Sequence, residues 1–209
     1  TGRARMSDKQ HPGVTRRALF KGAGLAAASG AVLRPLDALA REEAGTQQVP
    51  AQGPGPVQVR LKLNGKAAAL EAEPRHTLLD ALRRPLGLTG AKPVCDRGQC
   101  GACTVMLDGE TVYACTVLAV EAEGRTVTTV EGLGTPQSPH AIQTAFVQED
   151  GLQCGFCTPG MVVSCAWAVE QHGKELSEEQ ARAATAGNLC RCGTYPHVLR
   201  AAVRAAKEA

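Results

Sequence analysis

Aromatic side chains are scarce in this chain, with one Trp, two Tyr and three Phe among 209 residues. Proteins that hold single-stranded nucleic acid stack its bases on aromatic side chains, so the composition argues against a nucleic-acid partner. A glycine-rich nucleotide loop is missing as well, which argues against FAD or NAD binding by the chain itself. The five histidines are scattered and form no acid–base group. No catalytic residue is therefore expected in this chain.

Excess positive charge is confined to the N-terminus. The chain has 23 Lys and Arg against 20 Asp and Glu, a net charge of +3. Residues 1–40 hold seven of the basic and two of the acidic side chains, which leaves 16 basic and 18 acidic residues in the rest. Because the rest of the chain is slightly acidic, the basicity does not indicate a nucleic-acid or membrane surface.

Residues 1–40 resemble a secretion signal. Arg16 and Arg17 precede a weakly apolar stretch of only 12 uncharged residues, whereas a membrane-spanning helix needs about 20, so no stable membrane span is expected. The segment closes with a small-residue A-x-A site at Ala40. TRRALFK, at 15–21, is similar to a twin-arginine (Tat) signal, which exports folded, cofactor-loaded proteins to the periplasm. We expect cleavage after Ala40; the alternatives are a chance Arg pair in a basic tail and an uncleaved anchor.

Nine cysteines are the strongest compositional feature, and the spacing of the first four indicates a metal site. These four are Cys95, Cys100, Cys103 and Cys115. The first three are spaced C-x4-C-x2-C and the fourth follows after eleven residues, which is the plant-type spacing for a [2Fe–2S] cluster. Gly98 and Gly101 supply the backbone freedom that a loop around a cluster needs. The alternatives are a zinc site, which usually has two separated C-x2-C pairs, and two disulfides.

A second set of four cysteines follows near the C-terminus. Its members are Cys154, Cys157, Cys190 and Cys192, spaced C-x2-C, 32 residues, C-x-C. Residues i and i+2 rarely have the geometry for a disulfide, so the last two are predicted to share a metal centre with the first two. On spacing alone, a structural zinc stays open as an alternative. The ninth, Cys165, is expected to be a small buried hydrophobe in an apolar helix.

The pattern of apolar residues predicts an α+β protein. Residues 41–56, rich in Pro, Gly and Gln, are expected to be a linker. In 57–132, alternating apolar residues predict hairpins around Asn64-Gly65 and Asp108-Gly109, and a helix capped by Thr77 lies between them. Residues 133–209 are predicted to form a bundle of four short helices. The four helical segments are 138–151 with Ser138 as N-cap, 159–173 ending at Gly173, 177–185 capped by Ser177, and 196–208 beginning at Pro196.

Three motifs follow one another in the chain: CDRGQCGACTV, LQCGFCTPGM and GNLCRCGTYP. Together and in this order, they closely resemble the iron–sulfur subunit of the molybdenum hydroxylases, the xanthine dehydrogenase and aldehyde oxidoreductase family. The resemblance covers residues 57 to about 205. In type it is nearest to the small subunits of periplasmic aldehyde oxidoreductases and isoquinoline 1-oxidoreductases. It implies a ferredoxin-like β-grasp domain over 57–132 and a four-helix bundle over 133–209, each with a [2Fe–2S] cluster, and thereby removes the zinc alternative at the second set.

The resemblance also implies a role. The chain would be the electron-transfer subunit of an oxidoreductase whose large subunit binds molybdopterin and oxidises an aldehyde or N-heterocycle. Electrons would leave through the helical-domain cluster and then the β-grasp cluster, to an FAD-binding subunit or a cytochrome c. By the family pattern Gln153 and Cys192 contact the pterin, although Gln153 is alternatively an ordinary loop residue. Pro93 and Val94 stand before Cys95 where the family commonly has Gly, a departure that bears on loop shape and potential.

Two rival functions remain at this point. One is a self-standing exported ferredoxin-like carrier, and the other is a redox-silent zinc module. A carrier should have a largely polar surface, whereas one subunit of a complex must present an apolar contact face. Phe156 and Met161, next to cysteines of the second set, are expected to belong to such a face.

Overall fold

A computed structural model describes residues 53–208 of the chain. The expected signal peptide over 1–40, with Arg16 and Arg17, lies outside the described residues, as do residues 41–52 of the expected linker. The described residues belong to one compact unit. Within 53–208, no helix combines the length and the apolar character needed to cross a membrane.

Both predicted hairpins are present. β1 (Val57–Leu63) pairs antiparallel with β2 (Lys66–Ala72), and β3 (Thr104–Leu107) pairs antiparallel with β4 (Glu110–Tyr113). Asn64-Gly65 turns the first hairpin with φ of 48° and 81°, and Asp108-Gly109 turns the second with φ of 52° and 86°. Two successive positive φ values require residues that tolerate the left-handed region, which is why Asn-Gly and Asp-Gly stand at these turns.

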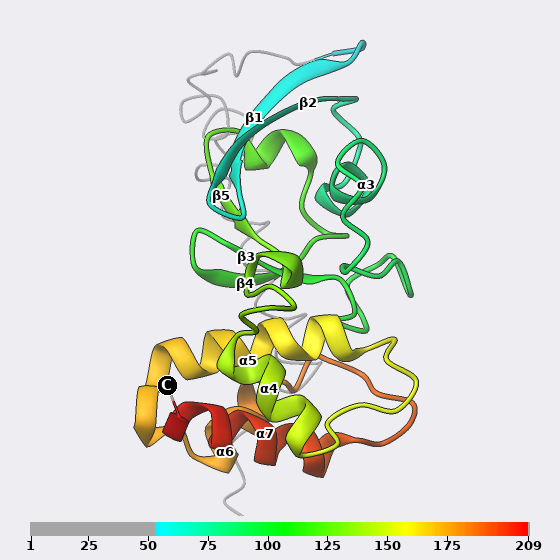
Figure 1. The fold of residues 1–209 in the computed structure, drawn as a ribbon. Coiled ribbons are helices and arrows are strands. Elements are labelled where there is room, and N and C mark those ends of the chain that lie inside the picture. Colours follow the sequence, from blue (N-terminus) through cyan, green and yellow to red (C-terminus); the bar gives the residue numbers. More distant parts are fainter. Residues whose placement is uncertain (1–52, 209) are drawn as a thin grey trace, which may run out of the picture. The chain divides into compact units, whose positions relative to one another are not determined.

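The strands form one five-stranded sheet in the order β2-β1-β5-β3-β4, in which only the β1–β5 pair is parallel. β5 spans Thr126–Thr128, and the single α-helix within 57–132, α3, spans Leu78–Arg83. Thr77 caps α3 as predicted, because its hydroxyl accepts a hydrogen bond of 3.1 Å from the Asp80 N–H. Figure 1 shows α3 beside the sheet, and its leucines are buried against strand residues. These residues are Leu78, Leu79 and Leu82 from α3 with Val59, Leu61, Val105 and Val127 from the strands.

Four α-helices make up the C-terminal half, as predicted. They are α4 (Ala141–Gln148), α5 (Thr158–His172), α6 (Glu178–Ala184) and α7 (Tyr195–Glu208). Ser177 caps α6 through its hydroxyl, and Gly173 ends α5 with a φ of 52°. Three short 3₁₀ turns were not predicted: η1 (Ala119–Ala122), η2 (Val130–Gly132) and η3 (Gly173–Glu175).

The predicted start of α4 is wrong. Ser138 does not cap the helix, because it forms a tight turn with Thr135 in which each N–H donates to the other's carbonyl oxygen. The helix begins at Ala141, and His140 is its N-cap: Nδ1 accepts a hydrogen bond of 3.2 Å from the Ile142 N–H. An imidazole acceptor thus replaces the expected serine hydroxyl. α7 also begins one residue early, at Tyr195 in place of Pro196.

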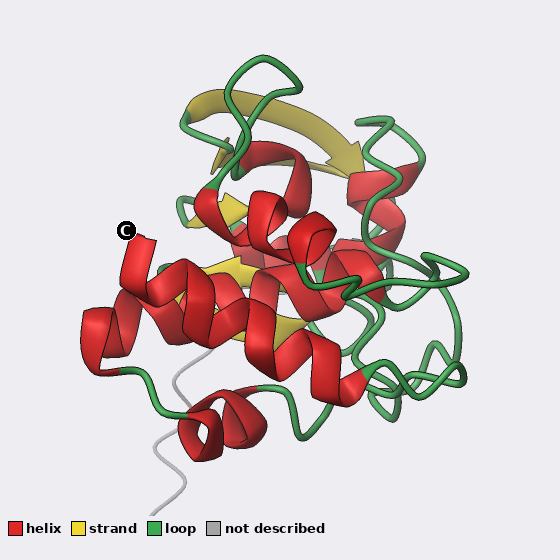
Figure 2. Ribbon diagram, turned by 60° about the horizontal axis from the view of Figure 1, so that its bottom comes forward, coloured by secondary structure: helices red, strands yellow, loops and turns green. Residues whose placement is uncertain are grey.

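α5 links the sheet to the bundle. It packs against α4, α6 and α7, and its other side contacts β3 and β4. Met106, on β3, is buried within the helical core. Figures 1 and 2 show the helices gathered on one side of the β3–β4 ribbon, with α5 next to it. Buried side chains occur on nearly all sides of α5, as expected of a helix that is enclosed by its neighbours.

Candidate metal centres

The first four cysteines converge around an irregular loop between α3 and β3. Cys95, Cys100 and Cys103 lie on that loop, and Cys115 follows β4. Positive φ at Gly98 (71°) and Gly101 (67°) curves the backbone around the sulfurs. Backbone N–H groups point at them: Gly98 donates to the Cys115 Sγ at 3.2 Å, and Gln99 donates to the Cys95 Sγ at 3.3 Å.

The thiols of this first set interact in two pairs. The Cys95 thiol is a neighbour of the Cys100 thiol, and the Cys103 thiol is a neighbour of the Cys115 thiol. N–H groups of Arg97 and Gln99 lower the pKa of Cys95 to about 7, because they stabilise its thiolate. Burial, together with the neighbouring thiols, raises the pKa of Cys103 to about 12. One pair is therefore partly exposed and the other is enclosed.

The second four cysteines come together from two loops, as predicted. Cys154 and Cys157 lie between α4 and α5, and Cys190 and Cys192 lie between α6 and α7. Again the thiols pair, Cys154 with Cys192 and Cys157 with Cys190. Gly155 and Gly193, each with positive φ, turn the two loops.

Local hydrogen bonds and burial set the acidity of this second set. Burial raises the pKa of Cys157 to about 12, with further contributions from Cys190 and Cys154. Burial also opposes the Cys190 thiolate, but hydrogen bonds from the Thr194 hydroxyl and N–H and from Cys157 outweigh it and bring the pKa of Cys190 to about 7. The Thr194 hydroxyl lies 3.2 Å from the Cys190 Sγ. Thr194 therefore supports the thiolate form of a predicted ligand.

Both sets suit a two-iron cluster. All nine cysteines lie in the described residues and none forms a disulfide. A [2Fe–2S] cluster distributes four thiolates over two irons, which matches the two pairs of neighbouring thiols in each set and the N–H groups aimed at sulfur. Cys165 is fully buried in α5, as predicted, and takes no part in either set.

The two sets border a common groove of about 420 Å³. Cys100 lines it from the first set, and Cys154, Cys157 and Cys190 line it from the second. Its rim carries exposed apolar side chains, which are Val94, Phe156 and Leu189. Phe156 is 54% exposed, as expected for a contact face, but Met161 is fully buried in the helical core, so that part of the prediction is wrong.

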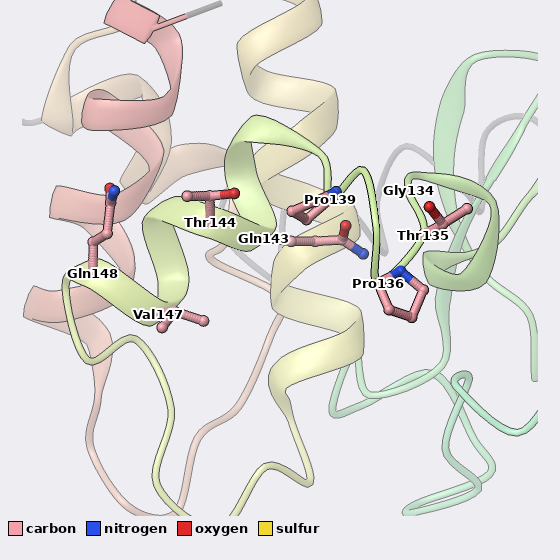
Figure 3. A pocket seen from close by; sticks show the side chains of 8 residues that line it. All are labelled: Gly134, Thr135, Pro136, Pro139, Gln143, Thr144, Val147 and Gln148. Atoms are coloured by element: carbon pink, nitrogen blue, oxygen red, sulfur yellow. The ribbon is translucent and has the colours of Figure 1, made fainter.

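A different hollow, of about 540 Å³, lies away from the cysteines. Figure 3 shows it on the loop at 134–139 and the outer side of α4, lined by Pro136, Pro139, Gln143 and Val147 among others. None of its lining residues is a cysteine or an ionisable side chain. The redox chemistry therefore belongs to the smaller, cysteine-lined groove.

Comparison with known proteins agrees with this arrangement. Residues 61–133 match a family described as a 2Fe-2S iron-sulfur cluster binding domain, and residues 129–203 match a [2Fe-2S] binding domain. The aldehyde oxidoreductase iron-sulfur-binding subunit PaoA of Escherichia coli (strain K12) is 41% identical, over 93% of this chain and 89% of that protein. The chain belongs to the iron–sulfur subunits of the molybdenum hydroxylase family.

Other relatives of this iron–sulfur subunit come from N-heterocycle dehydrogenases. The nicotinate dehydrogenase small FeS subunit of Eubacterium barkeri is 41% identical over 73% of this chain and 96% of that protein. Among solved structures, quinoline 2-oxidoreductase from Pseudomonas putida 86 contains a chain that superimposes with a TM-score of 0.68 at 39% identity, covering 73% of this chain and 94% of that one. The protein is thus an electron-transfer subunit of an oxidoreductase with two [2Fe–2S]-binding domains, and the free-carrier and zinc alternatives are set aside.

Sequence reasoning missed two residues that hold the loop of Cys190 and Cys192 in place. Asn188 and Tyr195 both lie within GNLCRCGTYP: Asn188 donates to the Gly101 carbonyl oxygen in the first cysteine loop, and the Tyr195 hydroxyl accepts from the Cys190 N–H of its own loop. Their proximity to the cysteines was the available signal, but their partners could not be inferred from spacing. Gln153 is exposed on the loop just before Cys154.

Proposed function

We propose that this chain is the iron–sulfur subunit of an exported, molybdopterin-dependent complex that oxidises an aldehyde or an N-heterocycle. The observation that carries the proposal is the convergence of two four-thiol sets on one groove with an apolar rim. The relatives named above are subunits of aldehyde and N-heterocycle oxidoreductases, which supports the same substrate classes here.

All eight ligands belong to this chain in the proposal. Cys95, Cys100, Cys103 and Cys115 hold one cluster, and Cys154, Cys157, Cys190 and Cys192 hold the other. When bound, each cluster supplies one-electron chemistry. The protein's own contribution is to place the thiolates, direct N–H groups at sulfur and enclose Cys103 and Cys157, all of which tune a cluster's potential.

The apolar groove supports an interface with the large subunit. Exposed apolar side chains around a concave surface are typical of sites covered by another protein. Val94, Phe156 and Leu189 would be buried there, and Gln153 and Cys192 would contact the molybdopterin of the partner. An electron would enter at the helical-domain cluster and leave from the β-grasp cluster to an FAD-binding subunit or a cytochrome c.

Export through the twin-arginine route is part of the proposal. Residues 53–209 make up about three quarters of the chain, so a match over 93% of it extends into the segment before residue 53. That segment contains Arg16 and Arg17, ahead of the proposed cleavage site after Ala40. Cluster loading before transport would commit the cysteines to iron before they meet an oxidising compartment.

The deciding experiment is a native pull-down of the full chain with its metals counted. About four irons per chain, molybdenum and a large co-purifying subunit are expected. A Cys192→Ala variant should lose iron from the second site, whereas the matched Cys165→Ala control should keep all four. Iron without molybdenum or a partner would overturn the complex, and a colourless, iron-free chain would overturn the cluster assignment.

A further inference from the structure

The loops that carry the two cysteine sets are directly hydrogen-bonded. The Leu189 N–H donates to the Cys100 carbonyl oxygen at 2.9 Å. Cys100 belongs to the first set, and Leu189 is bonded covalently to Cys190 of the second. One hydrogen bond therefore completes a short path from a ligand of one proposed cluster to a ligand of the other.

Asn188 ties the same two loops together from inside the protein. Its side chain is 3% exposed, and Nδ2 donates to the Gly101 carbonyl oxygen at 2.9 Å and to the Thr104 hydroxyl at 3.2 Å. On its other side, Oδ1 accepts a hydrogen bond of 2.8 Å from the Ser164 hydroxyl on α5. Every polar atom of this buried amide is engaged, with the β-grasp loop on one side and the bundle on the other.

The backbone segments around Asn188 pack closely against one another. A Cβ at Gly160 would collide with the Gly101 carbonyl oxygen, and a Cβ at Gly101 would lie 2.6 Å from the Asn188 amide nitrogen. Gly160 thus lets α5 approach the first cysteine loop, and Gly101 lets that loop approach the backbone at Gly187 and Asn188. Side-chain hydrogen bonds and close packing thus fix the same junction.

We propose that Asn188 is a positioning residue for electron transfer between the two clusters, an inference that rests on the ligand assignment above. Asn188 holds Gly101 and Leu189 in register, so the Cys100–Leu189 hydrogen bond stays formed. Electron tunnelling falls steeply with distance and is less efficient across a gap than along bonds. With both clusters bound, one electron would pass from the site of Cys190 to the site of Cys100, with no covalent bond formed or broken and no proton moved. The proposed large subunit supplies the electron.

Magnetic coupling between the two clusters provides a test that does not depend on enzyme activity. In the reduced, iron-loaded protein both clusters are paramagnetic, and their EPR signals split when they lie close together. Asn188→Ala should keep four irons per chain and both cluster signals, but lose or change the splitting. Asn64→Ala is the matched control, because Asn64 also makes three side-chain hydrogen bonds, all of them with Thr129 and none with a cysteine loop. The control should retain the splitting.

Two further variants keep the test decisive if Asn188→Ala folds poorly. Gly160→Ala should push the loops apart and change the splitting, whereas Ser164→Ala leaves both Nδ2 hydrogen bonds in place and should largely preserve it. Unchanged splitting in Asn188→Ala and Gly160→Ala would overturn the role of Asn188, as would four irons without splitting in the parent protein. Iron missing from the parent protein would instead refute the ligand assignment, so the two failures are distinguishable.

Discussion

The hydroxyl of Tyr195 accepts a hydrogen bond of 2.7 Å from the backbone N–H of Cys190. Tyr195 is the first residue of α7, and Cys190 lies five residues earlier, on the loop that carries the last two cysteines of the second set. The start of a helix thus anchors a proposed ligand loop through a single side chain. The same loop is held at Asn188, so it is fixed at both sides of Cys190.

Removal of that hydroxyl should weaken the second site. Tyr195→Phe leaves the half-buried Cys190 N–H without its acceptor, which costs about 1–3 kcal/mol of stability. We expect a lower midpoint for chelator-induced loss of the second cluster, followed by visible circular dichroism. The chain's other tyrosine is a matched control, because the Tyr113 hydroxyl makes no hydrogen bond to the described residues. An equal effect of Tyr113→Phe would contradict this interpretation.

Neighbouring residues of α4 should differ sharply in their contribution to stability. Phe146 is 2% exposed in the helical core, and Val147 beside it is 71% exposed. Phe146→Ala should therefore destabilise the protein by about 3–5 kcal/mol through lost burial and a cavity. Val147→Ala should stay within about 0.5 kcal/mol of the parent. Denaturant unfolding of the iron-loaded protein measures both, and similar losses would refute the position of α4.

Glu149 should make stability depend on acid pH. Hydrogen bonds and charge from Arg204, and then from Arg200, hold the pKa of Glu149 below its usual value. A carboxyl with a lowered folded-state pKa stabilises the fold above its unfolded pKa of about 4.3, and this contribution is lost as the pH falls through the folded value. The difference in Tm between the parent and Glu149→Gln should therefore be present at neutral pH and shrink in acid.

The matched control for Glu149 is another exposed glutamate. Glu179 on α6 forms no ion pair within the described residues, so Glu179→Gln should leave Tm nearly unchanged at every pH. A Glu149→Gln curve that runs parallel to the parent from neutral pH into acid would show that the Arg200 and Arg204 contacts do not perturb this carboxyl.

The proposed export route depends on the arginine pair. Replacement of Arg16 and Arg17 by Lys keeps the charge but removes the twin-arginine signature. The iron-loaded complex should then accumulate in the cytoplasm, as measured by immunodetection and iron content of periplasmic and cytoplasmic fractions. Lys9→Arg, a charge-preserving change outside the motif, should export normally. Periplasmic arrival of the double variant at the parent level would exclude this route.

The sequence predicted those structural features that depend on residues close together in the chain. Asn64-Gly65 and Asp108-Gly109 turned where expected because their φ values depend on the turn residues themselves. The cysteine spacings sufficed to group eight thiols into two sets. The prediction of Ser138 as the N-cap was wrong, because Ser138 forms a turn with Thr135. Met161 likewise gave no local sign of the core that encloses it.

The junction between the halves could not be predicted in this way. Asn188 contacts Gly101 and Thr104, which lie 87 and 84 residues earlier in the chain. No periodicity or spacing rule connects positions so far apart, and an asparagine in a loop ordinarily indicates only a turn. Its role follows from the tertiary packing alone.

The close approach at the glycines has a consequence for protein engineering. A Cβ at Gly187 would collide with the Tyr113 hydroxyl, just as one at Gly160 would collide with the Gly101 carbonyl oxygen. Each contact crosses from the ferredoxin-like half to the helical half, so the two halves are matched surfaces and not interchangeable cassettes. In a chimera that exchanges either half with a homologue, the residues on both sides of these contacts must remain compatible. Otherwise the two halves will not pack against each other.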